Sequence, residues 1–323
     1  MSSPSACLPS IIVTGCSSGI GAYCARALKA EGWRVFATVR REEDRAGLEA
    51  DGIETLLMDY TKPETIAALV ETVLACTGGR LDALFNNGAY GQAGAVEDLP
   101  VEALRQQFET NVFGWHDLTR RVIPVMRRQG RGRIVQCSSI LGVVPYRWRG
   151  AYNASKFALE GLSLTLRMEL AGSGIHVSLI EPGPIASRFT ANALTHIERV
   201  IDLENSVHAE EYRRQLRRLR GESKPARGKL GPEAVHAVLR HALTARKPRP
   251  HYVVTRPAKQ GVLLKKLLPA ALFYRIIGRL GCRGASSQAE SPQNACTLRG
   301  MPYVMRADRN QTGSLACLPS SPT

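Results

Sequence analysis

A short apolar run that ends in a glycine-rich turn restricts the fold of this chain more than any other stretch. Residues 11–14 read Ile-Ile-Val-Thr, glycines follow at positions 15, 19 and 21, and a helical pattern continues from Ala22 to Ala30. Strand, turn and helix in this order present backbone N–H groups at a helix N-terminus, where the phosphates of a dinucleotide bind. For the glycines alone, a tight turn without a ligand is the alternative interpretation.

Strand-like and helix-like stretches alternate after this turn. Because parallel strands are joined by right-handed helical crossovers, such alternation predicts a parallel sheet with helices on both faces. The predicted fold class is therefore α/β, with a single doubly wound, Rossmann-type sheet. Strands are predicted at 34–38, 55–58, 81–85, 133–137, 176–180 and 251–255, and helices at 63–76, 101–112, 208–220 and 232–245.

Changes in pattern mark the boundaries of the domain, which is predicted at 10–257 after an N-terminal arm at 1–9. Within it, residues 188–230 form a less regular insertion before the last helix. Such an insertion is placed to cover the carboxyl ends of the strands, where ligands bind, so we name it the lid. A basic amphipathic helical extension is predicted at 258–283, and a disordered tail rich in Ser, Pro, Gln and Asn at 284–323.

The charge of the chain is strongly positive, with 43 Lys and Arg residues against 28 Asp and Glu residues and a formal net charge of +15. Arginines at 213–220 fall at helical spacing, which is typical of a solvated helix face. Single-stranded nucleic acid needs aromatic side chains among such charges, and Tyr212 stands alone there, so no nucleic-acid partner is predicted. The basic and apolar residues of the 258–283 extension predict at most weak peripheral association with a membrane.

The sequence carries no signal for export or for a metal. The N-terminus lacks a basic segment, and the longest uncharged apolar run, 134–146, is shorter than a membrane span, so a cytoplasmic location is expected. The eight cysteines are scattered without a C-x-x-C pair. Neither a metal site nor a disulfide framework is therefore predicted.

Tyr152 and Lys156 form the candidate chemical pair. Four residues apart on a helix, they lie on the same face one turn from each other. A nearby ammonium favours the phenolate, so we expect Lys156 to lower the pKa of Tyr152 and make it an acid or base. An ordinary amphipathic helix surface is the alternative for this spacing alone.

The choice of cofactor depends on the end of the second predicted strand. An acidic residue there would bind the ribose 2'-hydroxyl of NAD, but this chain has Val39-Arg40-Arg41. A guanidinium suits a 2'-phosphate, so NADP(H) is the preferred cofactor and NAD(H) a possible one. A solvated arginine is the alternative for Arg40.

The ordered set of motifs resembles the short-chain dehydrogenase/reductase family over roughly residues 10–257. Residues 156–161 (Lys-Phe-Ala-Leu-Glu-Gly) and 181–184 (Glu-Pro-Gly-Pro) are most similar to its hydroxysteroid and retinoid branch and to bacterial relatives of that branch. One departure is Asn-Asn-Gly-Ala at 86–89 where the family has Asn-Asn-Ala-Gly. The motifs that carry the resemblance are Thr14 to Gly21, Asp59, residues 86–89, Asn111, Ser138-Ser139, Tyr152 with Lys156, and Pro182 to Ser187.

The resemblance implies a catalytic set of Asn111, Ser139, Tyr152 and Lys156. Tyr152 would be the general acid in carbonyl reduction and the general base in alcohol oxidation. Lys156 would also hold the nicotinamide ribose, Ser139 would bind the substrate oxygen, and Ser138 would be structural. Asn111 would hold a water that relays protons from Lys156, with a helix kink as its alternative role.

The resemblance also implies the cofactor contacts. Asp59 and Tyr60 would flank the adenine, the segment 182–187 would hold the nicotinamide carboxamide, and a homodimer or homotetramer would form through the helices near Asn111 and Tyr152. The complete set of expected cofactor-binding residues is Thr14, Gly15, Ser17, Ser18, Gly19, Ile20, Gly21, Arg40, Asp59, Tyr60, Asn86, Asn87, Gly88, Ala89, Tyr152, Lys156, Pro182, Gly183, Ile185 and Ser187.

These residues predict an NADP(H)-dependent oxidoreductase for a secondary or allylic alcohol and its carbonyl partner, an apolar molecule such as a steroid, retinoid or aliphatic compound. The alternative is a catalytically idle NADP(H)-binding regulator that uses the basic lid as an interaction surface. The complete catalytic set argues against idleness, because a regulator has no need of it.

Overall fold

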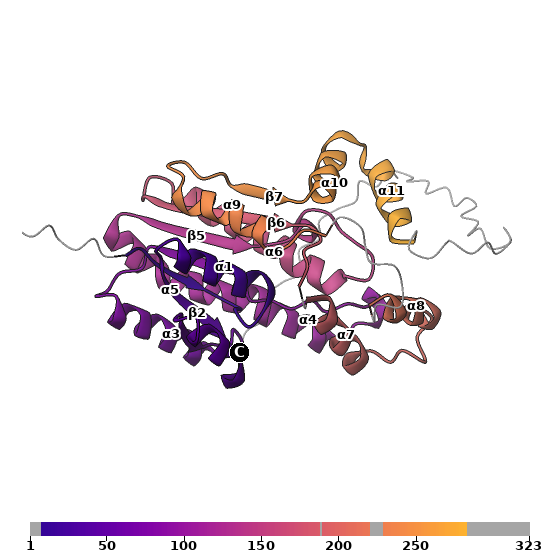
Figure 1. Cartoon of the computed structure of the whole chain (residues 1–323). Coiled ribbons are helices and arrows are strands. Elements are labelled where there is room, and N and C mark those ends of the chain that lie inside the picture. The colour runs from indigo at the N-terminus through magenta and orange to yellow at the C-terminus, as the bar shows by residue number, and fades with distance from the viewer. Residues whose placement is uncertain (1–7, 188, 220–228, 283–323) are drawn as a thin grey trace, which may run out of the picture. The chain divides into compact units, whose positions relative to one another are not determined.

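A computed structural model describes residues 8–187, 189–219 and 229–282 of the chain. Among these residues, seven parallel strands form one sheet in the order β3-β2-β1-β4-β5-β6-β7 (Figure 1). The strand order reverses between β1 and β4, which confirms the doubly wound α/β fold. The strands are β1 (Ser10–Val13), β2 (Arg34–Val39), β3 (Glu54–Leu57), β4 (Ala83–Asn86), β5 (Gly132–Cys137), β6 (Ile175–Pro182) and β7 (His251–Val254).

Helices cover both faces of the sheet. Helix α1 packs against α9 on one face, while α3 packs against α5, and α6 against β6, on the other (Figure 1). The helices over this part of the chain are α1 (Gly19–Ala30), α2 (Ala46–Glu49), α3 (Pro63–Cys76), α4 (Val101–Phe108), α5 (Gly114–Gln129), α6 (Gly150–Glu169) and α9 (Glu233–Thr244). Short turns of other helix types are η1 (Glu42–Asp44), η2 (Val96–Asp98), η3 (Glu109–Phe113) and η4 (Ile140–Gly142).

The strands follow from continuous apolar runs. Every residue of the central strands β1 and β4 is buried, as expected for a parallel sheet covered on both faces. The predicted strands agree with the observed ones to within two residues at each end. Most of the core lies between this sheet and its helices.

The helix predicted at 101–112 is present, but it does not end there. Helix α4 runs into the π-helical turn η3 and continues through α5 to Gln129. Gly114, which weakens a helix in isolation, lies at the junction because a Cβ there would stand 2.5 Å from the backbone oxygen of Tyr60. Close packing against Tyr60, in the segment after β3, therefore explains the glycine at position 114.

The lid contains α7 (Phe189–Val200) and α8 (Ala209–Leu219), and the C-terminal extension forms α10 (Arg256–Leu267) and α11 (Ala270–Cys282), which are separate helices on either side of Pro269. No helix in the described residues is long and apolar enough to cross a membrane. The predicted tail at 284–323 and most of the N-terminal arm lie outside the described residues.

Candidate active site

The glycine turn is shaped by direct contact with the turn after β4. Gly15 has a φ of +68°, and a Cβ on it would lie 2.4 Å from Gly88 Cα. A Cβ on Gly21 would lie 2.2 Å from the carbonyl oxygen of Gly15. Only glycine fits at both positions, because the left-handed φ and the backbone contact exclude a side chain.

Buried polar side chains hold the two turns together. The Tyr60 hydroxyl lies 2.8 Å from both Thr14 Oγ1 and Asn86 Oδ1, and the backbone N–H of Asn87 donates to Thr14 Oγ1 at 2.8 Å. Thr14, Tyr60 and Asn86 are buried, and burial raises the pKa of Tyr60 above its ordinary value. Their side chains therefore stabilise the two turns through buried hydrogen bonds. Their expected role as direct cofactor contacts stays a prediction.

The start of α1 is more open. Ser17 is exposed, and Ser18, Gly19 and Ile20 are half-buried. Ser18 is the N-cap residue but its side chain makes no capping hydrogen bond, which leaves the first N–H groups of α1 for an anion. A Cβ on Gly19 would lie 3.1 Å from Ser187 Cβ, so the turn and the segment after β6 approach each other as expected.

The two arginines after β2 differ in their partners. Arg41 pairs with Asp44 at 3.1 Å and with Glu43 at 3.4 Å. Arg40 is exposed and makes no ion pair with any residue in the described part of the chain. Asp59, predicted to flank the adenine, is half-buried, and its Oδ1 accepts from the backbone N–H of Thr61 at 2.9 Å.

The inverted Gly-Ala order at 88–89 is accommodated. A Cβ on Gly88 would lie 3.2 Å from the Cα of Gly15, a close but not prohibitive contact. The Trp115 indole donates to the carbonyl oxygen of Gly88 at 2.8 Å, and the Asn87 amide donates to the carbonyl oxygen of Thr14 at 3.0 Å. Both segments after the strands are thus tied to each other.

Asn111 lies in the π-helical turn η3 and is completely buried. Its Nδ2 donates to the carbonyl oxygen of Tyr90 at 2.9 Å and to Ser155 Oγ at 3.3 Å, and its Oδ1 accepts from the Tyr90 N–H at 3.3 Å. The helix irregularity considered as its alternative role is present, and such π-turns are frequent at functional sites. The water relay stays a prediction.

Lys156 is 1% exposed, and its Nζ donates to the carbonyl oxygen of Cys137 at 2.9 Å. The ammonium also lies 4.1 Å from the centre of the Trp115 ring, a favourable cation–π distance. Burial lowers the pKa of Lys156 to about 8, while the neighbouring Glu160 raises it. The side chain therefore keeps most of its charge at neutral pH.

Tyr152 and Lys156 share one face of α6, as predicted, with Nζ 5.8 Å from the centre of the tyrosine ring. The predicted direction of the pKa shift is wrong. Burial raises the pKa of Tyr152 above its ordinary value, and a side-chain hydrogen bond with Ser139 and the charge of Arg149 only oppose this shift. Desolvation destabilises the buried phenolate by more than Ser139 and Arg149 stabilise it.

Ser139 is positioned by the turn η4 that follows β5. Its Oγ accepts from the N–H of Leu141 at 3.1 Å, so the side chain caps the turn and is held beside Tyr152. The structure therefore brings Ser139, Tyr152 and Lys156 together, as the sequence predicts.

The segment after β6 packs on the last strand. A Cβ on Gly183 would lie 2.2 Å from Thr255 Oγ1, so glycine is required by packing at the start of α10. Pro182 is buried and Ile185 half-buried. The N–H of Ala186 donates to the carbonyl oxygen of Leu230 at 2.9 Å, which joins this segment to the end of the lid.

Two pairs of neighbouring aromatic rings include residues that the sequence does not single out, in the segments after β4 and after β6. The rings of Phe189 and Tyr152 are 5.3 Å apart, and those of His196 and Tyr90 are 4.6 Å apart. Burial raises the pKa of Tyr90 to about 12. The sequence could point to these residues only through their places after β4 and β6, because ligands of such folds bind at the carboxyl ends of the strands.

A glycine cradle at the switch point of a parallel sheet, with a buried tyrosine–lysine pair beside it, defines an oxidoreductase that binds a dinucleotide cofactor. The chain belongs to the short-chain dehydrogenase family, whose model matches residues 9–198. It is accordingly an NAD(P)-dependent enzyme that acts on alcohol and carbonyl groups. The turn fits such a cofactor, because no capping side chain occupies the first N–H groups of α1, which can bind the pyrophosphate.

Three comparisons support this assignment. The chain is 40% identical to the "uncharacterized oxidoreductase YbbO" of Escherichia coli K12 over 83% of its length and 93% of the relative. It is 34% identical to the "17-beta-hydroxysteroid dehydrogenase type 1" of Homo sapiens over 76% of this chain and 77% of the relative. A crystal structure of a short-chain dehydrogenase/reductase from Burkholderia phymatum in complex with NAD is 26% identical, with a TM-score of 0.67 over 79% of this chain and 91% of that one.

Proposed function

We propose that this enzyme is an NADP(H)-dependent reductase of an apolar ketone or aldehyde, with the secondary or allylic alcohol as product. The observation that carries the proposal is the position of Tyr152, buried between Ser139, Lys156 and Phe189. The phenol lies beside the Ser139 hydroxyl and the Phe189 ring, and the Lys156 ammonium is 5.8 Å from the centre of its ring. Such a site can bind a carbonyl oxygen and protonate it.

The proton comes from Tyr152 in this proposal. Because burial raises its pKa, the phenol is protonated at neutral pH, which is the form that a general acid requires. Ser139 would orient the carbonyl oxygen toward the phenol, and the Lys156 ammonium would stabilise the phenolate that remains. A bound nicotinamide cofactor supplies the hydride.

The preference for NADP(H) rests on Arg40. Its neighbour Arg41 is neutralised by acidic residues, whereas Arg40 is exposed and makes no ion pair within the described residues, so it can meet a 2'-phosphate. NADPH should bind at least tenfold tighter than NADH, a difference of about 1.4 kcal/mol. Arg40→Asp should reverse the order and the control Arg41→Asp should keep it. Equal affinities in fluorescence titrations of the wild-type protein would contradict the proposal.

An apolar substrate is supported by the ring of Phe189 beside Tyr152 and by the steroid named for the human relative. The test is a screen of NADPH consumption over steroid, retinoid and aliphatic carbonyls. Turnover with at least one class is expected. An enzyme that binds NADPH but reduces none of them would instead be the idle regulator considered above.

A homodimer is also proposed, because large apolar side chains are exposed on the helices expected to form the interface. Phe113, Phe157, Leu162 and Met168 are all between 39% and 70% exposed. Size-exclusion chromatography with light scattering should give about twice the mass of one chain. A monomer at micromolar concentration would contradict this.

Weak membrane association is proposed for α10 and α11. Leu263 and Leu267 are 55% and 70% exposed, and the two helices contain no acidic residue among their Lys and Arg side chains. Sedimentation with phosphatidylserine vesicles should occur at low salt and disappear at high salt. The cytoplasmic location stays a prediction.

A further inference from the structure

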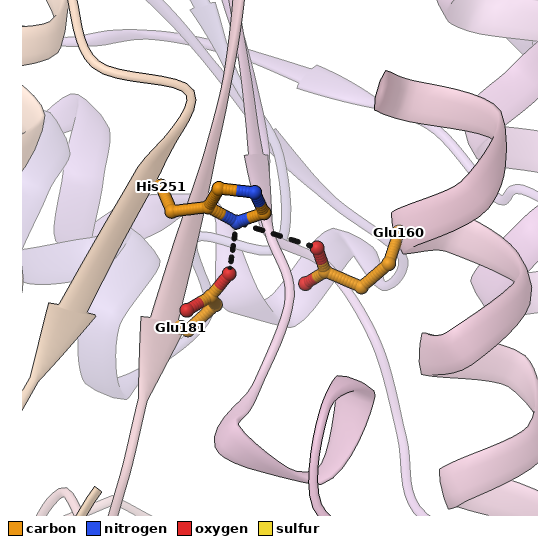
Figure 2. Close-up of side chains that lie close together, drawn as sticks. All are labelled: Glu160, Glu181 and His251. Atoms are coloured by element: carbon orange, nitrogen blue, oxygen red, sulfur yellow. Dashed lines mark hydrogen bonds and ion pairs between the residues drawn. The ribbon is translucent and has the colours of Figure 1, made fainter. Parts of the chain in front are cut away.

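Three ionisable side chains from three elements meet one helical turn beyond Lys156. Glu160 comes from α6, Glu181 from the end of β6, and His251 from the start of β7; Figure 2 shows the imidazole between the two carboxylates. One ligand atom from each lies within 4.8 Å of the other two. Glu160 is 6% exposed and Glu181 is 2% exposed, whereas the His251 side chain is 38% exposed and opens toward solvent.

Glu160 lacks the partners that a buried carboxylate needs. Neither of its oxygens has a hydrogen-bond partner within the part of the chain that the structure describes, and the nearest nitrogen of the cluster, His251 Nδ1, is 3.8 Å away. The neighbouring Ser138 hydroxyl favours the charged carboxylate without reaching hydrogen-bond geometry. Burial raises the pKa of Glu160 to about 7. Unpaired buried carboxylate oxygens are costly, so the cluster favours an additional cation.

We propose that Glu160, Glu181 and His251 bind a divalent transition-metal cation of the Zn²⁺ type. Imidazole nitrogen and carboxylate oxygen are both zinc ligands, and three protein ligands leave an open position for water. Calcium and magnesium prefer sets made of oxygen ligands alone, so the imidazole argues against them.

The present geometry requires a small adjustment. His251 Nδ1 is 2.5 Å from Glu181 Oε1, because a hydrogen bond joins them. Tetrahedral ligands at about 2.0–2.2 Å from zinc lie roughly 3.4 Å from each other, so these two atoms must separate by about 1 Å. His251 can supply this movement because it is the first residue of an edge strand, and its Nδ1 is already 3.8 Å from Glu160 Oε2.

A bound cation would join α6, β6 and β7 behind the catalytic pair. Since Glu160 raises the pKa of Lys156, a cation that neutralises Glu160 would also lower that pKa. The site would thus stabilise the sheet edge and tune the lysine. None of its three residues is among those predicted to contact substrate and cofactor, but Glu181 directly precedes Pro182.

The test is calorimetric titration of the chelator-treated full chain with ZnCl₂. We expect one tightly bound ion per chain, a melting temperature raised by several degrees, and at least tenfold weaker binding in Glu160→Gln and His251→Gln. His116→Gln, which removes an exposed histidine of α5, should bind like the wild type. Wild-type affinity in both site variants would overturn the proposal, and so would absence of zinc binding, which would leave His251 as the cation of the cluster.

Cysteine is the main competing ligand, and substitution with Co²⁺ separates the two. The proposed site contains no sulfur, so the absorption spectrum of the Co²⁺ protein should lack a thiolate charge-transfer band. This measurement uses the wild-type chain and remains valid if a variant fails to fold. A strong thiolate band from the single bound ion would overturn the proposal.

Discussion

The sheet and the lid are held by cores of very different size. The main core extends through the strands and their covering helices, from Ile11 to Val254. The lid has a separate small cluster, made of Ala93, Ala95, Ile197, Ile201, Tyr212 and Leu216. Because apolar burial scales with area, opening the lid costs far less than opening the sheet. We therefore expect the cofactor turns to be rigid and the lid, predicted to cover the substrate site, to move more easily.

Hydrogen bonds complete the attachment of the lid. The Tyr212 hydroxyl donates to Asp98 Oδ2 at 2.8 Å and accepts from the N–H of Ala95 at 2.8 Å, and the Ser206 hydroxyl donates to the same Asp98 oxygen at 2.6 Å. The glycine turns, by contrast, are tied by buried groups on the central strands.

The largest expected difference comes from the same truncation in the two cores. Leu84→Ala, in the middle of β4, should lower the free energy of unfolding by about 3–5 kcal/mol, because the packed sheet cannot collapse around the cavity. Leu216→Ala, in α8, should lower it by roughly 1–2 kcal/mol, because the lid can relax. Urea denaturation measures both. Equal losses would show that lid and sheet unfold as one unit.

The next prediction compares two glycines with positive φ. Gly15→Ala should cost roughly 2–3 kcal/mol and abolish tight NADPH binding, since its Cβ would meet the backbone of Gly88. Gly32→Ala has a similar φ of +87° but nothing within 4 Å of its Cβ, so only about 1 kcal/mol should be lost and binding should persist. If Gly15→Ala bound NADPH like Gly32→Ala, contact between the turns would not shape the cofactor site.

A smaller effect on stability than that of Gly15→Ala is expected for Tyr212→Phe. Loss of one hydroxyl from the lid should cost about 1–2 kcal/mol, because Asp98 and the N–H of Ala95 lose a partner. The KM for substrate should rise while the dissociation constant for NADPH stays the same. Tyr274→Phe, at an exposed tyrosine of α11, is the control. A matching rise in the NADPH constant would contradict the separation of the two regions.

Local patterns were sufficient to predict most of the sheet. Apolar runs between glycine turns and helices predict strands such as β1 and β4. The doubly wound fold then predicts which strands lie side by side. Helical spacing places Tyr152 and Lys156 on one face, whereas Ser139 is predicted only through the resemblance to the family. Local patterns also predict Arg40 beyond the end of β2, where it is exposed.

What the sequence could not reveal depends on burial and on contacts between distant segments. The raised pKa of Tyr152 follows from desolvation, which no spacing encodes. Tyr60 supports the turn because its hydroxyl reaches Thr14, 46 residues away. Glu160 and His251 meet only because β6 and β7 pair beside α6, so no metal site was predicted from cysteine and histidine spacing.

The central claim is that Tyr152 transfers the proton while the rigid turns and Lys156 bind the cofactor. Tyr152→Phe deletes one oxygen and keeps the ring that packs on Phe189. Turnover of the carbonyl substrate should fall by about 10²–10⁴-fold, with the NADPH dissociation constant changed by only a few-fold, whereas Lys156→Ala should damage both. Tyr274→Phe should leave both unchanged. Reduction by Tyr152→Phe at close to the wild-type rate would contradict the account, because the proton would then come from another group.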